Sequence, residues 1–519
     1  MSKKEKGKKV SRRDFAKSSV AAGAVAVAIP KALRGETLAE KGTSAGARAA
    51  GAKAATKAGT GPITMPPEVA YGGLDFDGRD VLLEDIMSPP GQAPDYPGGW
   101  QEGTTIPAEY YLEEKHFANE ESFLRKHFWF MADHESRIAN AGDYFVFEFG
   151  RGDSVIILRA NDGTVNAFHN VCRHRGSRLC LHGYEKDLPG PARLDGTAAD
   201  PRLSVVQPGP SGNTPVFRCP YHAWTYDLDG KLISLPTGMP EGFDEDQHGM
   251  HPAHIELVEG FIFVSLADGE PAEFDPFVAN WRRISQMYGT AGLKIAARAK
   301  HPTKANWKLA IENFEECYHC EPAHKSLVAV QWWQQSHVMS PEQITDIEEQ
   351  ISDHEHPGQP RRQLSATRRE DSYTMNVHLS PEYVTGSLDG MPVAPLLLDD
   401  WTHMRRGATT GFSTSFFAAY DDYLAVARFT PRDILLTDVE IFWLVKGDAK
   451  DSEVDVERMI ELWDVTYQED LWIVENNQHG IRSSRYNHGG HGQPYARREG
   501  GPAGFIKWYM TEVAPLAEG

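Results

Sequence analysis

Two short stretches of this sequence each carry one cysteine and one histidine at close spacing. In VCRHRG, one residue separates Cys172 from His174, and in RCPYHAWTY, two residues separate Cys219 from His222. Each pair follows a short apolar run typical of a strand, so two loops can face each other across one metal centre. Two thiolates and two imidazoles would suit a tetrahedral zinc ion, but zinc fingers take their cysteines from one pair and their histidines from the other. The mixed pairs favour a different kind of metal centre, held between two loops.

A second group of possible metal ligands lies in ENFEECYHCEPAHK. His319 and His324 are five residues apart, and on an unbroken helix their side chains would diverge by about 140°. They converge only if the helix stops between them, and Pro322 is placed to stop it. Two convergent histidines and one carboxylate form the facial triad that holds non-heme Fe(II) with positions open for oxygen.

The carboxylate is expected in a later helical stretch, ELWDVTYQEDLWIVENNQHG. Asp470 interrupts an apolar stripe made by Trp463, Tyr467 and Val474, and a buried carboxylate must be paired or bound to a metal. Periodicity alone leaves Glu469 open as an alternative ligand, because it lies on a neighbouring face of the same helix.

The Cys-His pairs resemble a Rieske [2Fe–2S] centre, in which two cysteines hold one iron and two histidines hold the other. The Arg-Gly after His174 and the Pro-Tyr-His-Ala-Trp around His222 match this pattern. One feature departs from it, since 44 residues separate His174 from Cys219. The extra material is rich in Pro, Gly and Asp, which predicts an exposed insertion over residues 183–215.

From about residue 105 to 510, the chain resembles the Rieske non-heme iron oxygenases of the large, alpha-subunit type. Asn306-Trp307-Lys308, Glu312-Asn313 and the acid-x-x-His-x-x-x-x-His pattern carry this resemblance, and the family pattern around the third ligand selects Asp470 over Glu469. The resemblance implies an oxidoreductase that uses O2. Its implied cluster ligands are Cys172, His174, Cys219 and His222, and its implied ligands for mononuclear Fe(II) are His319, His324 and Asp470.

The resemblance also implies partners and further site residues. Glu316 takes the place of the acidic residue that links the two metal centres of this family. In the implied homotrimer, it would connect the cluster histidine His222 of one subunit to His319 of the next. Asn313 would belong to the same catalytic site. An external reductase or ferredoxin would supply electrons. The substrate would be a small organic molecule, and hydroxylation of an aromatic ring is one possible reaction. The other is monooxygenation or demethylation of a small or quaternary ammonium compound, which glutamate rather than aspartate at position 316 favours.

The predicted elements form an α+β chain. A helix over residues 110–128 precedes short strands within 144–170, 223–226 and 261–265, which together predict an all-β domain. Helices at 306–320 and 454–477 and adjacent antiparallel strands within 411–447 predict an α+β domain. The resemblance makes these a Rieske domain over 105–269 and a helix-grip (START-like) catalytic domain with an antiparallel sheet over 270–519.

The first hundred residues have a different composition. Residues 1–34 resemble a twin-arginine signal with Arg12 and Arg13 as the pair, which implies export to the periplasm, or a cytoplasmic protein if the signal does not function. Residues 35–104 are expected to be a linker followed by an irregular region. The net charge of −20 argues against a nucleic-acid partner.

Two alternative functions, and the roles of one motif and one set of aromatic residues, remain open on sequence grounds. A respiratory Rieske electron-transfer protein would have two further loop cysteines, but Ser177 and Tyr221 stand at those positions. A second alternative is a catalytically inactive ligand-binding protein. Cys317 and Cys320 form a Cys-x-x-Cys that could be a redox or zinc motif, although packing is the simpler interpretation. A final set could line a substrate pocket or fill the core: Trp332, Trp333, Phe416, Phe417, Tyr420 and Tyr423.

Overall fold

The computed structural model describes residues 83–180, 210–331, 373–380, 383–399, 406–412, 414–486, 492–496 and 499–517. The signal-like segment 1–34, most of the region 35–104, Trp332 and Trp333, and the larger part of the insertion therefore lie outside the described residues. Among the helices that the structure describes, none combines the length and apolar character needed to cross a membrane.

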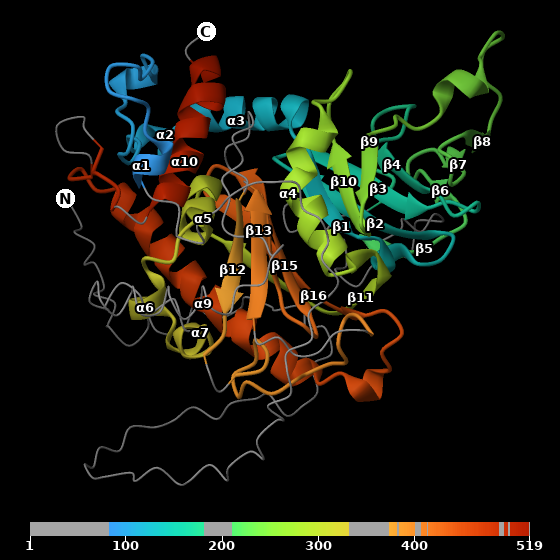
Figure 1. Cartoon of the computed structure of the whole chain (residues 1–519). Helices are drawn as coiled ribbons and strands as arrows, with labels where there is room; N and C mark the ends of the chain where they lie inside the picture. The colour runs from blue at the N-terminus through green and yellow to red at the C-terminus, as the bar shows by residue number, and fades with distance from the viewer. Residues whose placement is uncertain are drawn as a thin grey trace, which may run out of the picture. The chain divides into compact units, whose positions relative to one another are not determined.

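Short antiparallel strands make up the first domain (Figure 1). They form three small sheets, and Gly150 and Gly163 adopt positive φ in the turns between the first strands. The expected strand at 223–226 is shorter than predicted, because Ala223 itself has φ of 58°. The three sheets, in strand order, are β4 (Val165–His169), β3 (Asp153–Arg159), β2 (Asp143–Phe149) and β5 (Ser211–Asn213); β6 (Phe217–Arg218), β7 (Thr225–Tyr226) and β8 (Leu232–Ser234); and β1 (Phe130–His134), β10 (Phe261–Ser265) and β9 (His254–Val258).

A six-stranded antiparallel sheet is the centre of the second domain. Its middle strands are buried on both faces, since every residue of β14 and every residue of β15 from Leu424 to Pro431 is buried. In order, the strands are β11 (Leu293–Thr303), β16 (Leu436–Lys446), β15 (Leu424–Asp433), β14 (Ser415–Ala419), β13 (Arg406–Phe412) and β12 (Tyr373–His378).

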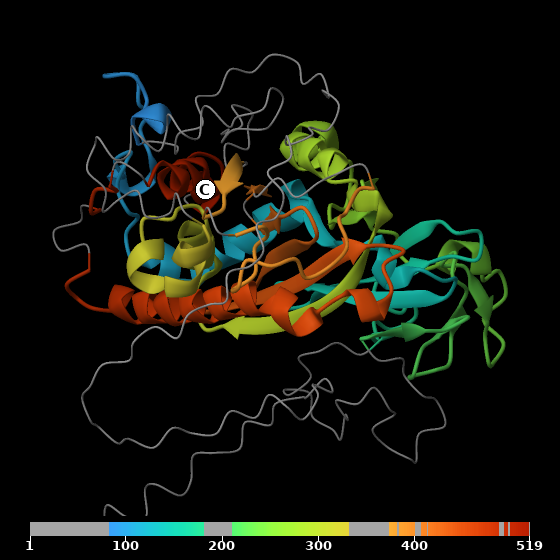
Figure 2. The same cartoon turned by 60° about the horizontal axis from the view of Figure 1, so that its bottom comes forward.

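Helices bring the chemistry-bearing residues against this sheet. The long helix α9 lies along β11, and α5 packs on both α9 and β15 (Figure 2). The helices are α1 (Leu83–Ile86), α2 (Glu109–Leu112), α3 (Glu114–His127), α4 (Phe274–Met287), α5 (Trp307–Phe314), α6 (Cys320–Ala323), α7 (Lys325–Val330), α9 (Val456–Ile481) and α10 (Gly500–Trp508).

Buried charges join the two domains. Asp133 on β1 accepts hydrogen bonds from Arg298 on β11, at 2.7 Å and 2.9 Å, and from Arg137. Burial alone would raise the pKa of Asp133, but Arg298 and Arg137 hold it below its usual value. Arg298 and Arg428 also share Glu440 on β16. Removing one partner of such a network leaves an uncompensated buried charge, so the network fixes how the first domain meets the sheet.

The mixed α+β class and the order of the domains are confirmed, but one detail of the sequence prediction is wrong. The helix predicted over 306–320 ends at Phe314, and Pro322 does not stop a helix. It lies in the first turn of α6, where a proline is tolerated because the N–H it lacks would have no partner within the helix. The break falls instead at His324, whose φ of −118° and ψ of 75° separate α6 from α7.

Candidate metal centres

The first centre lies between two loops at one end of the all-β domain. The loop after β4 carries Cys172, and the side chain of Asn170 accepts hydrogen bonds from the backbone of Leu179 and Cys180, which closes the loop on itself. The loop between β6 and β7 carries Cys219, and its turn is closed by the hydrogen bond from the Ala223 N–H to the Cys219 carbonyl. Each ligand-bearing loop is thus fixed by its own hydrogen bonds.

Both sulfur atoms of this centre are buried. Cys172 and Cys219 are hydrogen-bonded to each other, and this bond lowers the pKa of Cys219 to about 5 and raises that of Cys172. Backbone N–H groups of Tyr221 and His222 also point at the Cys219 sulfur. The Tyr226 hydroxyl lies 3.3 Å from the Cys172 sulfur. The N–H groups and the Tyr226 hydroxyl stabilise thiolate charge, which is what an iron–sulfur cluster requires of its ligands.

The two histidines of this centre lie on its outer side. The ring centroids of His174 and His222 are 4.6 Å apart. The His174 ring stacks on Trp224 and the His222 ring on Tyr221, which keeps both imidazoles in place. Two buried sulfurs with two partly exposed imidazoles beside them fit the donor set of a Rieske cluster.

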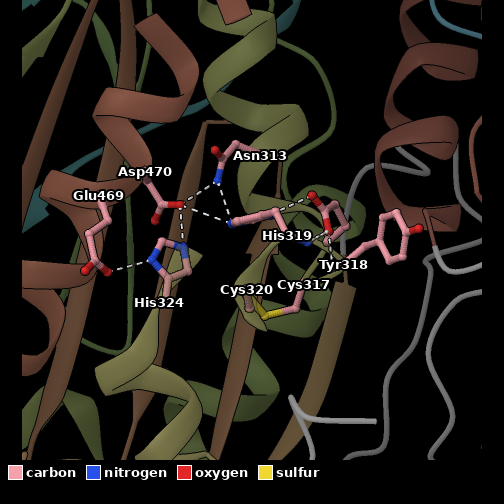
Figure 3. The surroundings of a disulfide bond; sticks show 9 residues. Asn313, Cys317, Tyr318, His319, Cys320, His324, Glu469 and Asp470 are labelled. Atoms are coloured by element: carbon pink, nitrogen blue, oxygen red, sulfur yellow. Dashed lines mark hydrogen bonds and ion pairs between the residues drawn. A yellow bond between two sulfur atoms is a disulfide. The ribbon is translucent and has the colours of Figure 1, made fainter. Parts of the chain in front are cut away.

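The second centre brings together residues from α9 and from the segment between α5 and α7 (Figure 3). Nε2 of His319 lies 3.1 Å from Oδ1 of Asp470, and Nε2 of His324 lies 2.9 Å from the same oxygen. The Asn313 amide donates a hydrogen bond to Asp470 over 2.8 Å. Three potential ligand atoms therefore meet at one point, as a facial triad requires.

A carboxylate holds the far side of each histidine ring. Glu316 Oε1 lies 2.6 Å from Nδ1 of His319, and Glu469 Oε2 lies 2.8 Å from Nδ1 of His324. Burial would lower the pKa of His319, but its bonds to Asp470 and Glu316 raise it to about 10. Carboxylates in this position fix the tautomer that leaves Nε2 free for a metal.

Periodicity alone left Glu469 open as a ligand, although the family pattern selected Asp470. It lies on α9 next to Asp470, but its carboxylate contacts the outer edge of His324, opposite the edge that faces Asp470. It therefore orients the His324 ring and lies away from the point where Asp470 meets the two histidines. The sequence signal for Glu469 as a site residue was its position next to Asp470, which did not reveal its contact with His324.

Other predicted site residues have simpler positions. Phe416, Phe417, Tyr420 and Tyr423 are all buried in the core, with no more than 7% of any of them exposed. Cys317 and Cys320 are joined in a disulfide rather than packed as free thiols. Cys180 is a free, fully buried cysteine.

Two family models match the chain in the order in which the centres occur. Residues 128–241 match the Rieske [2Fe-2S] domain, and residues 290–514 match the catalytic domain of the ring hydroxylating alpha subunit. The chain is also 31% identical to the glycine betaine monooxygenase oxygenase subunit of Chromohalobacter salexigens over 79% of its own length and 86% of that protein.

The chain belongs to the Rieske oxygenase alpha subunits. This Rieske oxygenase has a [2Fe–2S] cluster and a mononuclear iron, and it uses O2. It is 33% identical to the carnitine monooxygenase oxygenase subunit of Escherichia coli K12, over 43% of its length and 53% of that protein.

Solved structures share the fold of this Rieske oxygenase. The quaternary ammonium Rieske monooxygenase CntA in complex with L-carnitine covers 80% of this chain, with a TM-score of 0.55 and 23% sequence identity. The Rhodococcus naphthalene 1,2-dioxygenase covers 80% as well, with a TM-score of 0.55 and 20% identity. Because the two TM-scores are equal, the fold alone does not choose between an ammonium and an aromatic substrate.

Proposed function

We propose that this Rieske oxygenase hydroxylates an N-methyl group of a small quaternary ammonium compound. The observation that carries the proposal is the similarity to a glycine betaine monooxygenase subunit along 86% of that protein. Insertion of one oxygen atom into a methyl C–H bond consumes O2, two electrons and two protons, and it yields a hydroxymethyl group and water. The hydroxymethyl ammonium product then releases formaldehyde and leaves a tertiary amine.

The metal ligands are proposed residue by residue. Cys172, His174, Cys219 and His222 hold the cluster, and His319, His324 and Asp470 hold the iron. When bound, the cluster supplies single electrons and the iron supplies oxygen activation. Glu316 and Glu469 keep Nε2 of the two histidines directed at the metal position, and Asn313 holds the Asp470 carboxylate by its hydrogen bond.

Electron transfer is proposed to run between subunits of a homotrimer. In both Figure 1 and Figure 2, the strands β6–β8 beside the cluster loops and the helices α6 and α7 beside the second centre lie on opposite sides of the large sheet. Tyr221 at the cluster and Tyr318 next to His319 are exposed by 54% and 49%. A neighbouring subunit whose own Tyr221 face covers Tyr318 would bring its His222 toward Glu316. A reductase or ferredoxin would supply electrons from outside.

Export by the twin-arginine route is a separate proposal. It rests on Arg12 and Arg13 in SRRDFAK, and the route suits a protein that receives its cluster before transport. Fusion of residues 1–34 to a reporter that is active only in the periplasm would test it. A reporter that stays inactive with both arginines present would remove the proposal.

The substrate proposal is tested with purified protein, a surrogate reductase and a panel of compounds. Glycine betaine, choline and carnitine are compared with naphthalene and benzoate, and oxygen uptake is measured together with formaldehyde. We expect one formaldehyde per O2 consumed with at least one quaternary ammonium compound. A coupled ring-hydroxylated product, with no formaldehyde from any ammonium compound, would replace the proposal with aromatic hydroxylation.

A further inference from the structure

A disulfide lies inside the segment that carries both histidines of the second centre. Cys317 and Cys320 are bonded to each other on either side of Tyr318 and His319, and Cys320 directly follows His319 in the chain (Figure 3). Cys320 is 3% exposed, whereas Cys317 is partly exposed. The proposed function gives this disulfide no part in catalysis.

The Cys320 sulfur is close enough to the histidines to act as a metal ligand. Its Sγ and one ring nitrogen from each of His319 and His324 all lie within 4.8 Å of one another. Ligand atoms around a tetrahedral zinc ion lie about 3.5 Å apart, given the usual Zn–N and Zn–S bond lengths. A modest rotation of side chains would therefore close a His-His-Cys site. In the disulfide, however, the sulfur cannot become the thiolate that binds metals.

The backbone of this segment does not depend on the disulfide. The Ala323 N–H donates to the His319 carbonyl, and the His324 N–H donates to the Cys320 carbonyl over 2.7 Å. The His319 N–H donates to the Glu316 carboxylate over 3.1 Å. These bonds would keep the segment in place after the S–S bond is broken, so a released Cys320 thiolate would stay beside the two imidazoles.

We propose that the Cys317–Cys320 disulfide determines which metal the second centre accepts. With the bond intact, His319, His324 and Asp470 offer two nitrogens and one hard oxygen, a donor set suited to Fe(II). With the bond reduced, Cys320 adds a soft thiolate to the two histidines and creates a site that favours Zn²⁺. The inference rests on the proposed iron ligands and adds a second, redox-dependent metal site to them.

The reduction needs a dithiol, such as a protein of the thioredoxin class. Its thiolate attacks the partly exposed Cys317 sulfur, the S–S bond breaks, and the electron pair leaves on the Cys320 sulfur. The second thiol of the reductant then releases Cys317 as a thiol. Overall, the dithiol becomes a disulfide, and two electrons pass to the Cys317–Cys320 pair.

Two matched variants separate the two sulfurs. Cys317→Ser leaves only the sulfur near the histidines, and Cys320→Ser leaves only the distant one. Each protein is stripped of mononuclear metal with a chelator, checked for retained cluster absorbance, and titrated anaerobically with zinc. We expect Cys317→Ser to bind zinc roughly 10- to 100-fold more tightly than Cys320→Ser or the untreated protein. The unsubstituted protein, once reduced with dithiothreitol and desalted, should bind zinc as tightly as Cys317→Ser.

Zinc-edge X-ray absorption identifies the ligand directly, because the cluster contains no zinc. We expect a Zn–S shell at about 2.3 Å in Cys317→Ser and in the reduced protein, and only nitrogen and oxygen near 2.0 Å in Cys320→Ser. Equal zinc affinities without a sulfur shell, or free Cys317 and Cys320 thiols in protein purified without reductant, would overturn the inference. Iron binding by the untreated protein tests the proposed iron ligands independently.

Discussion

The carboxylate of Glu469 lies 2.8 Å from Nδ1 of His324, on the edge of the ring opposite Asp470. Two consecutive residues of α9 thus hold the two nitrogens of one imidazole. We expect Glu469→Gln to lower iron affinity roughly 10- to 100-fold, because an amide orients the ring less firmly than a carboxylate. Iron content after dialysis against a chelator measures the effect. Glu461→Gln, an exposed change on the same helix, is the control and should match the unaltered protein.

Asp470 supplies the third potential ligand atom. We expect Asp470→Ala to lose mononuclear iron and turnover while the cluster keeps its spectrum, because the cluster ligands lie in the other domain. Metal analysis and electron paramagnetic resonance of the reduced protein measure both centres in one sample. Full activity in this variant would show that the ligand assignment is wrong.

Glu316 contacts His319 over 2.6 Å. We expect Glu316→Gln, once fully loaded with iron, to slow reoxidation of the cluster roughly 10- to 100-fold, because the proposed bridge to the neighbouring subunit is weakened. Stopped-flow absorbance of the reduced protein, mixed with substrate and oxygen, measures this step. Unchanged reoxidation with normal coupling would contradict the bridging role.

Tyr226 places its hydroxyl 3.3 Å from the Cys172 sulfur. A hydrogen bond to a ligand sulfur stabilises the more negative, reduced cluster. We expect Tyr226→Phe to lower the midpoint potential by about 20–60 mV, which corresponds to one ordinary hydrogen bond in a one-electron couple. A redox titration monitored by electron paramagnetic resonance measures the potential. Tyr221→Phe, which keeps the ring stacked on His222, is the control.

Glu312 lies between the Tyr111 and Tyr495 hydroxyls, which donate hydrogen bonds to it over 2.6 Å and 2.8 Å. Burial raises the pKa of Glu312 from 4.5 to about 7. Because the folded chain holds this proton more tightly than the unfolded chain, stability is lost as the pH rises from about 4.5 through 7. The loss amounts to roughly 3 kcal/mol above that range.

Glu312→Gln should remove this part of the pH dependence, since the amide stays neutral. Denaturant unfolding at pH 5 and pH 8 measures the free energy of unfolding. We expect the difference between the two values to shrink in the variant. An unchanged difference would assign the pH dependence to other groups.

Much of the fold followed from local patterns in the sequence. The strand predicted over 261–265 is β10, and the helix predicted over 454–477 is α9, which runs to Ile481. β10 is a continuous apolar run, and α9 has apolar residues at helical spacing. The predicted helix over 306–320 failed because the local pattern does not register Glu316, which accepts hydrogen bonds from the backbone of Tyr318 and His319 and holds a turn there.

The site could be predicted as a set of residue types but not as a geometry. Spacing pointed to His319 and His324, and the family pattern selected Asp470 over Glu469. Neither indicated that Glu469 contacts His324, because that contact depends on how α9 lies against the segment that carries this histidine. The disulfide between Cys317 and Cys320 was also missed, because packing is the simpler interpretation of two cysteines interleaved with the histidines.

The ion pair between Lys308 on α5 and Glu120 on α3 joins residues 188 positions apart. Both side chains are fully buried, and Trp307 and Tyr509 also donate hydrogen bonds to the same carboxylate. During synthesis, α3 therefore leaves the ribosome before Lys308, Trp307 and Tyr509 have been made. The intervening all-β domain can fold while Glu120 on α3 still lacks these partners. The set of partners around Glu120 is therefore complete only when Tyr509, which follows α10, has been synthesised.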